Sequence, residues 1–447
     1  MYKNISNNYI FPDEPVKPAS KPIPPKKGSK PEPLPENSLW FTHDPAIYHD
    51  PVSDNYYIYG TGAMCLKSTD LINWTKVGKV IDAPPKESCD WVGGNDIWAP
   101  DIVKAGNTYR LYGSNSTWGV RQSCIFLAES DNAQGPFISK YPVIKTSEKL
   151  PVNAIDANII TCVHTGRQYM VYGSFWGGIH IIELDAETGL AKDSNSIGKC
   201  IARRPKWADC AIEGPYIIYN PDTDYYYLFV SFGSLKSDYN IRVARSKNVT
   251  GPYYDAFGRD MTDLNDTDNT LGYMISCGYQ FDNTTAFMGP GHNSVLRDFD
   301  GSWYLVNHVR EKNFKGGEPS TMHIRRILWS NDGWPLASPL LYAGEKVQSI
   351  TNELLCRTYQ RITLSPGIPQ GICHSIPMEL TPDNKLIISG CIHGHWHITG
   401  KNTIEISYGK TVEELAVIPG WDYELWQPSL ALTGKNKDNI CVWAKSI

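Results

Sequence analysis

A repeated hairpin pattern is the feature that most constrains the fold of this 447-residue chain. In each copy, turn residues precede a short run that alternates aromatic and aliphatic residues and often ends in Gly. Turn residues followed by such runs are typical of β-hairpins. The tyrosines that anchor the copies recur at intervals of 52, 60, 58 and 77 residues and are Tyr57, Tyr109, Tyr169, Tyr227 and Tyr304.

These intervals predict the architecture. A period of about 50 to 60 residues with strands only is typical of the four-stranded blades of a β-propeller. Helical periodicity is scarce, so the fold class is expected to be all-β, with five blades for five copies. The long last interval leaves room for an insertion, which is expected at residues 255–285, rich in Asp and Asn.

Composition divides the chain into three parts. Residues 1–37 are rich in Pro and Lys and poor in aliphatic residues, which predicts a disordered tail or linker. Residues 38–346 hold the repeats and are expected to form the propeller, which would be the catalytic domain. From about residue 347 the runs are short and separated by turns, so residues 347–447 are expected to form a smaller β domain, a barrel or a sandwich.

Several classes of protein are excluded by composition. The formal charge is −5 and no long basic run lies outside the N-terminal segment, which argues against nucleic-acid binding. No apolar run is long enough to span a membrane, and Met1–Ile10 lacks the apolar core of a signal peptide. The chain has 26 Tyr and 14 Trp residues, which suit β-strands and also suit sugar binding, where a ring face lies against C–H groups.

Three acidic residues stand at one offset from the repeats. Asp44 (in Thr-His-Asp-Pro), Asp156 (in Asn-Ala-Ile-Asp) and Glu213 (in Ala-Ile-Glu-Gly-Pro) precede the tyrosines of their own repeats by 13 or 14 residues. An equal offset predicts an equal place in the blade. A charge in an apolar run is costly unless it is paired, although Asp-Pro is also a common turn. Glycoside hydrolysis needs one carboxyl as acid and one carboxylate as base or nucleophile, and this set supplies both.

The motifs around these residues resemble those of glycoside hydrolase family 43, and within it the endo-α-1,5-L-arabinanases. The motifs that carry the resemblance are His-Asp-Pro (43–45), Ile-Trp-Ala-Pro-Asp (97–101), Asn-Ala-Ile-Asp (153–156), Gly-Ser-Phe-Trp-Gly-Gly (173–178), Ile-Glu-Gly-Pro-Tyr (212–216) and Gly-Pro-Gly-His-Asn-Ser (289–294). The tail resembles the C-terminal β domain of the longer arabinanases.

The resemblance implies an inverting mechanism with defined roles. Asp44 would be the general base that activates water, Glu213 the general acid, and Asp156 a residue that modulates the pKa of the acid and orients it and the sugar. Base and acid would then lie about 6.5–9.5 Å apart. His292 would contact one calcium ion whose other ligands are waters, although calcium prefers oxygen ligands and a histidine hydrogen-bonded in the core is the alternative.

Candidate substrate contacts lie near these motifs. A pentofuranose unit needs a ring face and a few hydrogen bonds, although core packing is an equally good explanation for any one tryptophan. Besides Asp44 and Asp156, the candidates are Trp98, Trp118, Gly119, Asn153, Ala154, Ile155, Asn158, Ser174, Phe175 and Trp176.

Other functions fit the same scaffold. An exo-acting α-L-arabinofuranosidase or a β-xylosidase would use the same carboxylates, and the insertion could then block one end of the cleft. A carbohydrate-binding propeller without catalysis is the alternative from another class.

The expected partner is arabinan or an arabino-oligosaccharide, with no nucleic acid or membrane, and the protein is expected to be monomeric. Because arabinan is extracellular, secretion is expected; a cytoplasmic enzyme acting on imported oligosaccharides is the alternative.

Overall fold

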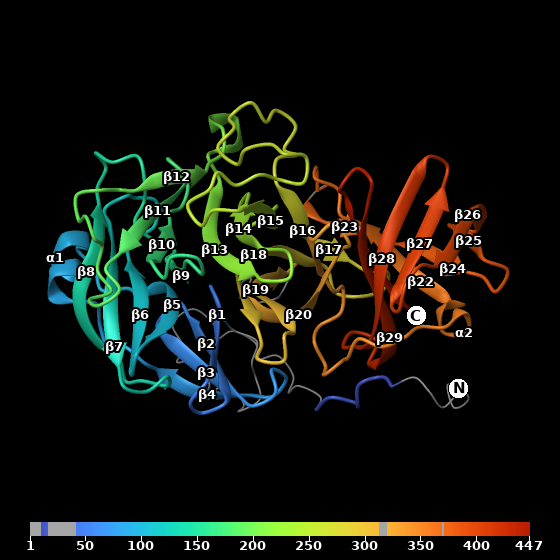
Figure 1. Ribbon diagram of the computed structural model, residues 1–447, viewed down its shortest axis with the longest axis horizontal. Helices are drawn as coiled ribbons and strands as arrows, with labels where there is room; N and C mark the ends of the chain where they lie inside the picture. The colour runs from blue at the N-terminus through green and yellow to red at the C-terminus, as the bar shows by residue number, and fades with distance from the viewer. Residues whose placement is uncertain (1–9, 17–41, 313–319, 369–370) are drawn as a thin grey trace.

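The computed structural model describes residues 10–16, 42–312, 320–368 and 371–447. Within these ranges the chain forms a ring of five sheets and a closed barrel, which lie side by side (Figure 1). The prediction of an all-β, five-bladed propeller followed by a smaller β domain is confirmed, and of the two forms expected for that domain the structure shows the barrel. No helix in the described ranges is both long and apolar enough to cross a membrane.

Each of the first four blades is an antiparallel sheet of four strands in chain order. The fifth is a six-stranded sheet in the order β21-β20-β19-β18-β17-β23. The strands of the propeller are β1 (Ala46–Asp50), β2 (Asn55–Gly60), β3 (Met64–Ser68), β4 (Trp74–Lys79), β5 (Trp98–Ala105), β6 (Thr108–Asn115), β7 (Ser123–Ser130), β8 (Ile138–Thr146), β9 (Asn158–Thr161), β10 (Gln168–Tyr172), β11 (Ile179–Leu184), β12 (Lys199–Ala202), β13 (Ile212–Asn220), β14 (Tyr225–Phe232), β15 (Asn240–Ser246), β16 (Tyr273–Ser276), β17 (Tyr279–Gln280), β18 (Phe287–Arg297), β19 (Trp303–Glu311), β20 (Thr321–Trp329) and β21 (Pro335–Ala337).

The turns that open the sequence repeats have the same backbone form in all five blades. The turn before the second strand contains a residue with positive φ, which Gly adopts freely and which Asp tolerates better than most residues. The anchoring tyrosines lie on these second strands, β2, β6, β10, β14 and β19. The turn residues with positive φ are Asp54, Gly106, Gly166, Asp224 and Gly301.

The first strand of each blade lies nearest the propeller axis. β1 contacts β5, β5 contacts β9, β9 contacts β13, β13 contacts β18, and β18 contacts β1, so these five strands close a ring. Hydrophobic side chains fill the space between neighbouring blades, for example Leu228 and Ile181 between blades 4 and 3. The ends of the inner strands are therefore held in fixed relative positions.

The prediction of one insertion over residues 255–285 is wrong in its second half. Residues 273–276 form β16, the outer strand of blade 4, and residues 279–280 form β17. The outer strand lacks the aromatic pattern that marks the second strands, so the repeat did not reveal it. Residues 255–272 do extend beyond the blade, and they pack against blade 3 and the short 3-10 helix η1 (Lys206–Ala208), where Trp207 Nε1 donates a hydrogen bond to the Asp266 carbonyl at 2.9 Å.

The C-terminal domain is a closed barrel in which β22 pairs with both β24 and β30. β23 leaves the barrel and pairs in parallel with β17 of blade 5. The remaining elements are β22 (Thr358–Thr363), β23 (Cys373–His374), β24 (Ile376–Leu380), β25 (Lys385–Ile388), β26 (Cys391–Ile398), β27 (Thr403–Tyr408), β28 (Thr411–Asp422), β29 (Gln427–Asn436), β30 (Cys441–Ser446) and the helices α1 (Lys86–Val92) and α2 (Asn352–Leu355).

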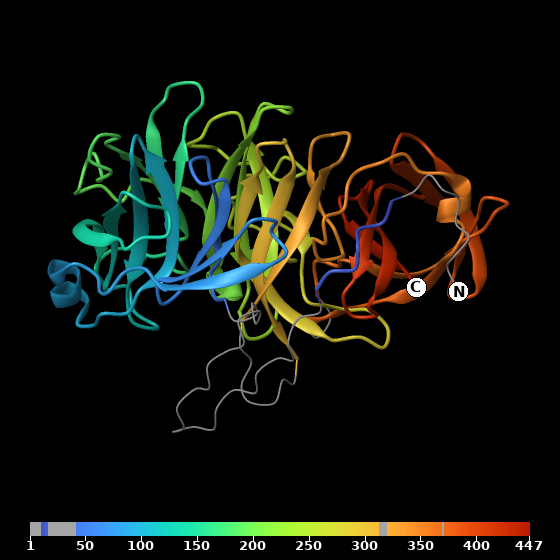
Figure 2. The same ribbon diagram turned by 90° about the horizontal axis from the view of Figure 1, so that it is seen from below.

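Part of the predicted N-terminal tail contacts the barrel domain. Residues 10–16 form no helix or strand, and they run alongside the barrel (Figure 2). The backbone of Ile10 exchanges two hydrogen bonds with the Gln348 side chain, and Trp426 Nε1 donates to Glu14 Oε1 at 2.6 Å. The rest of the predicted tail, residues 1–9 and 17–37, lies outside the described residues.

Candidate active site

The three candidate carboxylates lie at the same end of three inner strands. Asp44 and Asp156 each stand two residues before the first strand of their blade, β1 and β9, and Glu213 is the second residue of β13. The equal offset in the sequence thus corresponds to an equal place in the blades. Because β9 and β13 contact each other and β1 joins them through β5 and β18, the three side chains meet near the axis.

Asp44 and Asp156 share a left-handed backbone, with φ of 53° and 64°. Asp adopts this conformation at a lower cost than most residues, and such strain is concentrated at functional sites. Each backbone N–H is held by another blade: Asp44 N donates to His308 Nδ1 at 3.2 Å, and Asp156 N donates to Ser114 Oγ at 3.0 Å. The surrounding side chains therefore compensate for the unusual backbone.

Asp44 is buried among groups that stabilise its charge. Thr61 Oγ1 donates to Oδ2 at 2.6 Å, and His292 Nδ1 lies 3.2 Å from Oδ1. Burial alone raises the pKa of Asp44, but the nearby histidines and the Thr61 hydrogen bond outweigh it and hold the pKa well below its usual value. Asp44 is therefore a carboxylate at neutral pH.

The pKa values of His308 and His292, two of the three histidines beside Asp44, are shifted in opposite directions. Burial holds the pKa of His308 well below its usual value, and its Nδ1 accepts the Asp44 N–H, so the ring is neutral with its proton on Nε2. Its 3.5 Å approach to Asp44 Oδ1 is thus no ion pair. Burial also lowers the pKa of His292, but Asp44, Asp156 and Glu213 outweigh burial and raise it. The three carboxylates around His292 therefore favour its protonated form.

Glu213 is held by two hydroxyl groups. Ser174 Oγ donates to Oε2 and Tyr239 OH donates to Oε1, both at 2.8 Å. The Tyr239 ring also stacks on His308, with ring centroids 5.9 Å apart, and His308 in turn contacts Asp44. One aromatic cluster therefore links the surroundings of Asp44 and Glu213.

Asp156 lies beside Glu213 and contacts the backbone that follows it. Gly214 N, the next backbone N–H after Glu213, donates to Asp156 Oδ2 at 3.2 Å. Burial raises the pKa of Asp156 to about 7, with His292 opposing the shift and Glu213 and Asp44 adding to it. Asp156 therefore exchanges its proton near neutral pH, while Asp44 stays ionised.

The predicted substrate contacts fall into two groups. Trp118 is 84% exposed and Trp176 is 37% exposed, so both can offer a ring face to a ligand. Arg121 lies over the Trp176 ring and Lys236 over the Trp118 ring. Gly119, which follows Trp118, is also exposed. The less exposed candidates lie at strand ends or beside them: Trp98 begins β5, Asn153, Ala154 and Ile155 precede Asp156, and Ser174 and Phe175 follow β10.

The side chain of Asn158 makes hydrogen bonds to two neighbouring inner strands. Its Nδ2 donates to Asp101 Oδ2 at 3.1 Å, and its Oδ1 accepts from Ile217 N at 2.9 Å. Asp101 also accepts from Ile159 N at 2.8 Å, and burial raises the pKa of Asp101 to about 7. The Asn158 amide thus joins β9 to β5 and β13, and its contact with substrate stays a prediction.

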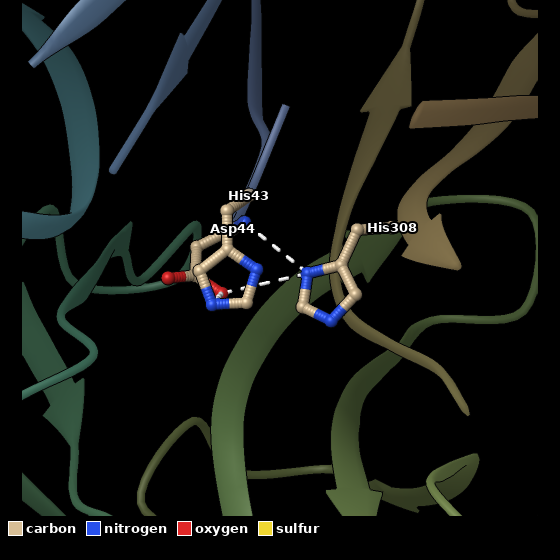
Figure 3. A group of neighbouring side chains, drawn as sticks. All are labelled: His43, Asp44 and His308. Atoms are coloured by element: carbon tan, nitrogen blue, oxygen red, sulfur yellow. Dashed lines mark hydrogen bonds and ion pairs between the residues drawn. The ribbon is translucent and has the colours of Figure 1, made fainter. Parts of the chain in front are cut away.

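His43, Asp44 and His308 could hold a metal ion, since one ligand atom from each lies within 4.8 Å of the others (Figure 3). The donor set does not fit calcium, because two of the three donors are imidazole nitrogens, which suit zinc and other transition metals. The sequence prediction named His292 instead. His292 is not one of these three residues, and its Nδ1 lies 3.2 Å from Asp44 Oδ1.

Comparisons with known proteins identify the family of both domains. Residues 39–335 match the family described as Glycosyl hydrolases family 43, and residues 339–444 match a C-terminal lipocalin-like domain of that family. The chain belongs to glycoside hydrolase family 43.

Relatives extend the match over both domains of this family 43 hydrolase. It is 31% identical to an extracellular endo-α-(1→5)-L-arabinanase of Thermotoga petrophila over 89% of this chain and 93% of the relative. A crystal structure of an endo-1,5-α-L-arabinanase from that organism has a TM-score of 0.83, with 29% identity over 93% of this chain and 100% of the other. An extracellular endo-α-(1→5)-L-arabinanase of Bacillus subtilis is 31% identical over 90% and 92%.

Several residues that contact the candidate carboxylates or the strands beside them escaped the sequence analysis. Thr61, Tyr239 and His308 come from other strands or turns and carry no local motif, so only the fold brings them to the carboxylates. Two had a signal: His43 is adjacent to Asp44, and Asp101 ends the Ile-Trp-Ala-Pro-Asp motif. A buried acid beside Pro could have been recognised as a structural group.

Proposed function

We propose that this family 43 hydrolase cuts internal α-1,5-L-arabinofuranosidic linkages of arabinan with inversion, and that Asp44, Asp156 and Glu213 carry the reaction. The supporting observation is the meeting of three carboxylates with different electrostatic surroundings around His292. The endo-arabinanase relatives, which span both domains, support the substrate. We place the boundary between the catalytic and barrel domains at residues 346 and 347.

The surroundings suit one role for each carboxylate. Asp44, held ionised, takes a proton from a water molecule that attacks the anomeric carbon. Glu213, oriented by Ser174 and Tyr239, gives its proton to the leaving oxygen as the glycosidic bond breaks. Asp156 adjoins Glu213 through Gly214 and orients the acid and the sugar. Asp44 then releases its proton to solvent and Glu213 takes one up, which restores the enzyme.

The endo mode has a specific rival. An extracellular exo-α-(1→5)-L-arabinofuranosidase of Cellvibrio japonicus is 31% identical over 66% of this chain, so the catalytic domain is compatible with both modes. The endo-arabinanase relatives cover about nine-tenths of this chain, including the barrel domain. This coverage favours endo action, and β-xylosidase activity has no such support.

The deciding experiment follows products from debranched arabinan by size and by anomeric configuration. A ladder of oligosaccharides with inverted configuration is expected. Release of arabinose alone would refute endo action, and retention would refute the assignment of Asp44 as base, because inversion requires a base–acid separation of about 6.5–9.5 Å that leaves room for water. No hydrolysis of any arabinoside by the folded protein would favour the non-catalytic, carbohydrate-binding alternative.

We also propose a calcium ion held by His292 and waters, beneath the carboxylates, where their negative charge attracts a cation. Bound to a cation, His292 would have to be neutral, so binding competes with its protonation. Titration calorimetry with calcium at about pH 6 and about pH 8 should then show tighter binding at the higher pH. No heat of binding at either pH would refute this site.

Secretion is the proposed localisation, because both endo-arabinanase relatives are named extracellular. A polymeric substrate outside the cell requires the enzyme to be there.

We propose that the protein acts as a monomer, which light scattering of the purified chain would test.

A further inference from the structure

Two buried cysteines meet where the propeller joins the barrel domain. The Sγ atoms of Cys277 and Cys373 lie 3.7 Å apart, although the residues are 96 positions apart in the sequence. Cys277 directly follows β16 of blade 4, and Cys373 begins β23, the strand that the C-terminal domain adds to blade 5. The two thiols therefore face each other across the junction of the domains.

The backbone holds the thiols in this position. β17 and β23 pair in parallel with Tyr279 opposite Cys373, and Cys373 N donates to the Gly278 carbonyl at 2.8 Å. A Cβ atom on Gly278 would lie 2.0 Å from the Gly371 carbonyl oxygen, so only Gly allows these two segments to approach each other so closely. The contact between the sulfurs follows from this close pairing.

We propose that Cys277 and Cys373 are a redox site that oxidises to a disulfide and ties the propeller to the barrel domain. The oxidant is a small disulfide such as oxidised glutathione. Two protein thiols and one oxidant disulfide become one protein disulfide and two small-molecule thiols, so the two electrons and two protons leave with the reduced oxidant. The sulfurs must approach from 3.7 Å to the bond length of about 2.05 Å.

The contact indicates the order of the two exchanges. Cys277 donates its S–H to Cys373, and this hydrogen bond lowers the pKa of Cys373. Cys373 is also the more accessible thiol, 5% exposed against 0% for Cys277. The Cys373 thiolate attacks the oxidant first and forms a mixed disulfide. Cys277, after losing its proton, then displaces the small-molecule thiolate.

Burial and connectivity set the expected properties of the bond. The oxidant reaches Cys373 when the two-residue strand β23 separates from β17, so oxidation is slower than at the exposed Cys391. The disulfide closes a long loop that spans both domains. Such a loop restricts the unfolded chain strongly, so the oxidised protein should be the more stable form.

The test uses the full chain after incubation with oxidised glutathione or with dithiothreitol. Free thiols are alkylated under denaturing conditions, and tryptic peptides are analysed by mass spectrometry. The oxidised sample should contain a linked pair of peptides with Cys277 and Cys373, lighter by two hydrogen atoms, and its melting temperature should rise by about 5 °C or more. Alkylation of both cysteines after oxidation would refute the proposal, and a linked pair without a higher melting temperature would refute the stabilising tie.

Matched variants separate this pair from the other thiols. Cys277→Ser and Cys373→Ser should each abolish the redox-dependent shift of the melting temperature, whereas Cys65→Ser, at a buried cysteine of blade 1, should keep it. A shift that persists in Cys373→Ser would assign it to other cysteines and overturn the proposal. The wild-type peptide analysis decides the question even where a variant fails to fold.

Discussion

Asp44 and Glu213 have opposite kinds of neighbours, and this difference is what separates their proposed roles. Histidines and a threonine hydroxyl surround Asp44, and both kinds of neighbour favour its ionised form. Glu213 contacts two hydroxyl groups, Ser174 and Tyr239, which orient it and can accept as well as donate a hydrogen bond. Both residues therefore depend on neighbours that single substitutions can remove.

Replacing Glu213 by Gln removes the proposed proton donor and keeps the side-chain size. We expect kcat on debranched arabinan to fall by about 10²–10⁴-fold, since general acid catalysis contributes that much. An aryl arabinofuranoside with a good leaving group should lose much less, because its leaving oxygen needs no proton. Initial rates on both substrates check this. Equal losses on both would contradict the role of Glu213 as the acid.

Tyr239→Phe removes one hydrogen bond to Glu213 and keeps the ring that stacks on His308. As a positioning residue, Tyr239 should affect kcat on arabinan by about 10-fold, with KM nearly unchanged, because a misplaced acid weakens the transition state and not substrate binding. Steady-state kinetics measure both parameters. A change in KM alone would instead make Tyr239 a substrate contact.

At the scale of elements, the inner strands of blades 2, 3 and 4 are joined by a chain of polar side chains. Asp101 on β5 accepts hydrogen bonds from the backbone and side chain at the start of β9, and Asn158 on β9 accepts one from Ile217 N on β13. This chain fixes the spacing of the strands that carry Asp156 and Glu213. Because no positive group among the described residues pairs with the buried Asp101, its proton matters for stability.

Asp101→Asn should change how stability depends on pH. Burial raises the pKa of Asp101 to about 7 in the folded protein, so folding binds a proton between the unfolded pKa and about 7, and the contribution of this group to stability falls as pH rises through that range. Asn cannot ionise and can still accept the backbone hydrogen bonds. Relative to wild type, the variant should therefore gain stability as pH rises from about 4 to about 7. Parallel melting curves over this range would contradict the expected titration of Asp101.

The loops at the end of the blades should bind polymer more than monomer. Trp118 from blade 2 lies under Lys236 from blade 4 and is 84% exposed. We expect Trp118 to stack on a sugar beyond the cleaved linkage, and an aromatic stack contributes about 1 kcal/mol. Trp118→Ala should therefore raise the KM for arabinan by about 5-fold or more. The KM for an aryl arabinofuranoside, which does not reach this ring, should stay unchanged. Phe299→Ala, at an exposed ring in the β18–β19 turn, is the control and should change neither. An unchanged KM for arabinan in Trp118→Ala would exclude this contact.

For the whole molecule, the propeller and the barrel share one hydrophobic core. The largest cluster of buried side chains joins Leu305 and Trp334 of the propeller to Ile418 and Trp443 of the barrel. Thr433 Oγ1 donates to the Ala337 carbonyl at 2.7 Å, and Lys435 forms an ion pair with Asp332 across the same junction. The barrel therefore covers apolar surface of blade 5.

A chain that ends at residue 346 should be unstable. Removal of the barrel exposes the apolar surface of blade 5 to water, which promotes aggregation and lowers stability. We expect the truncated protein to melt lower than the full chain by roughly 10 °C or more, and the full chain to unfold in one transition. Calorimetry of both proteins tests this. Two separate transitions in the full chain would show that the domains fold independently.

The architecture of the propeller was predictable because short stretches of sequence encode each blade. A turn residue with positive φ and an aromatic second strand recur in every blade, so residues such as Asp54, Gly106 and Tyr109 indicate the blades from the sequence alone. The outer strand of blade 4 escaped because it carries no such pattern, and the excursion of β23 into blade 5 escaped because strand pairing over long sequence distances leaves no local signal.

The sequence by itself determined the β fold class, the number of blades and the equal placement of Asp44, Asp156 and Glu213, because each depends on spacing along one chain. Only the tertiary structure decided what surrounds them. His292 and His308 of blade 5 reach Asp44, and Tyr239 of blade 4 reaches Glu213. The charge of a buried group depends on burial and on neighbours within a few ångströms, and for these residues the neighbours come from strands that are far apart in the sequence.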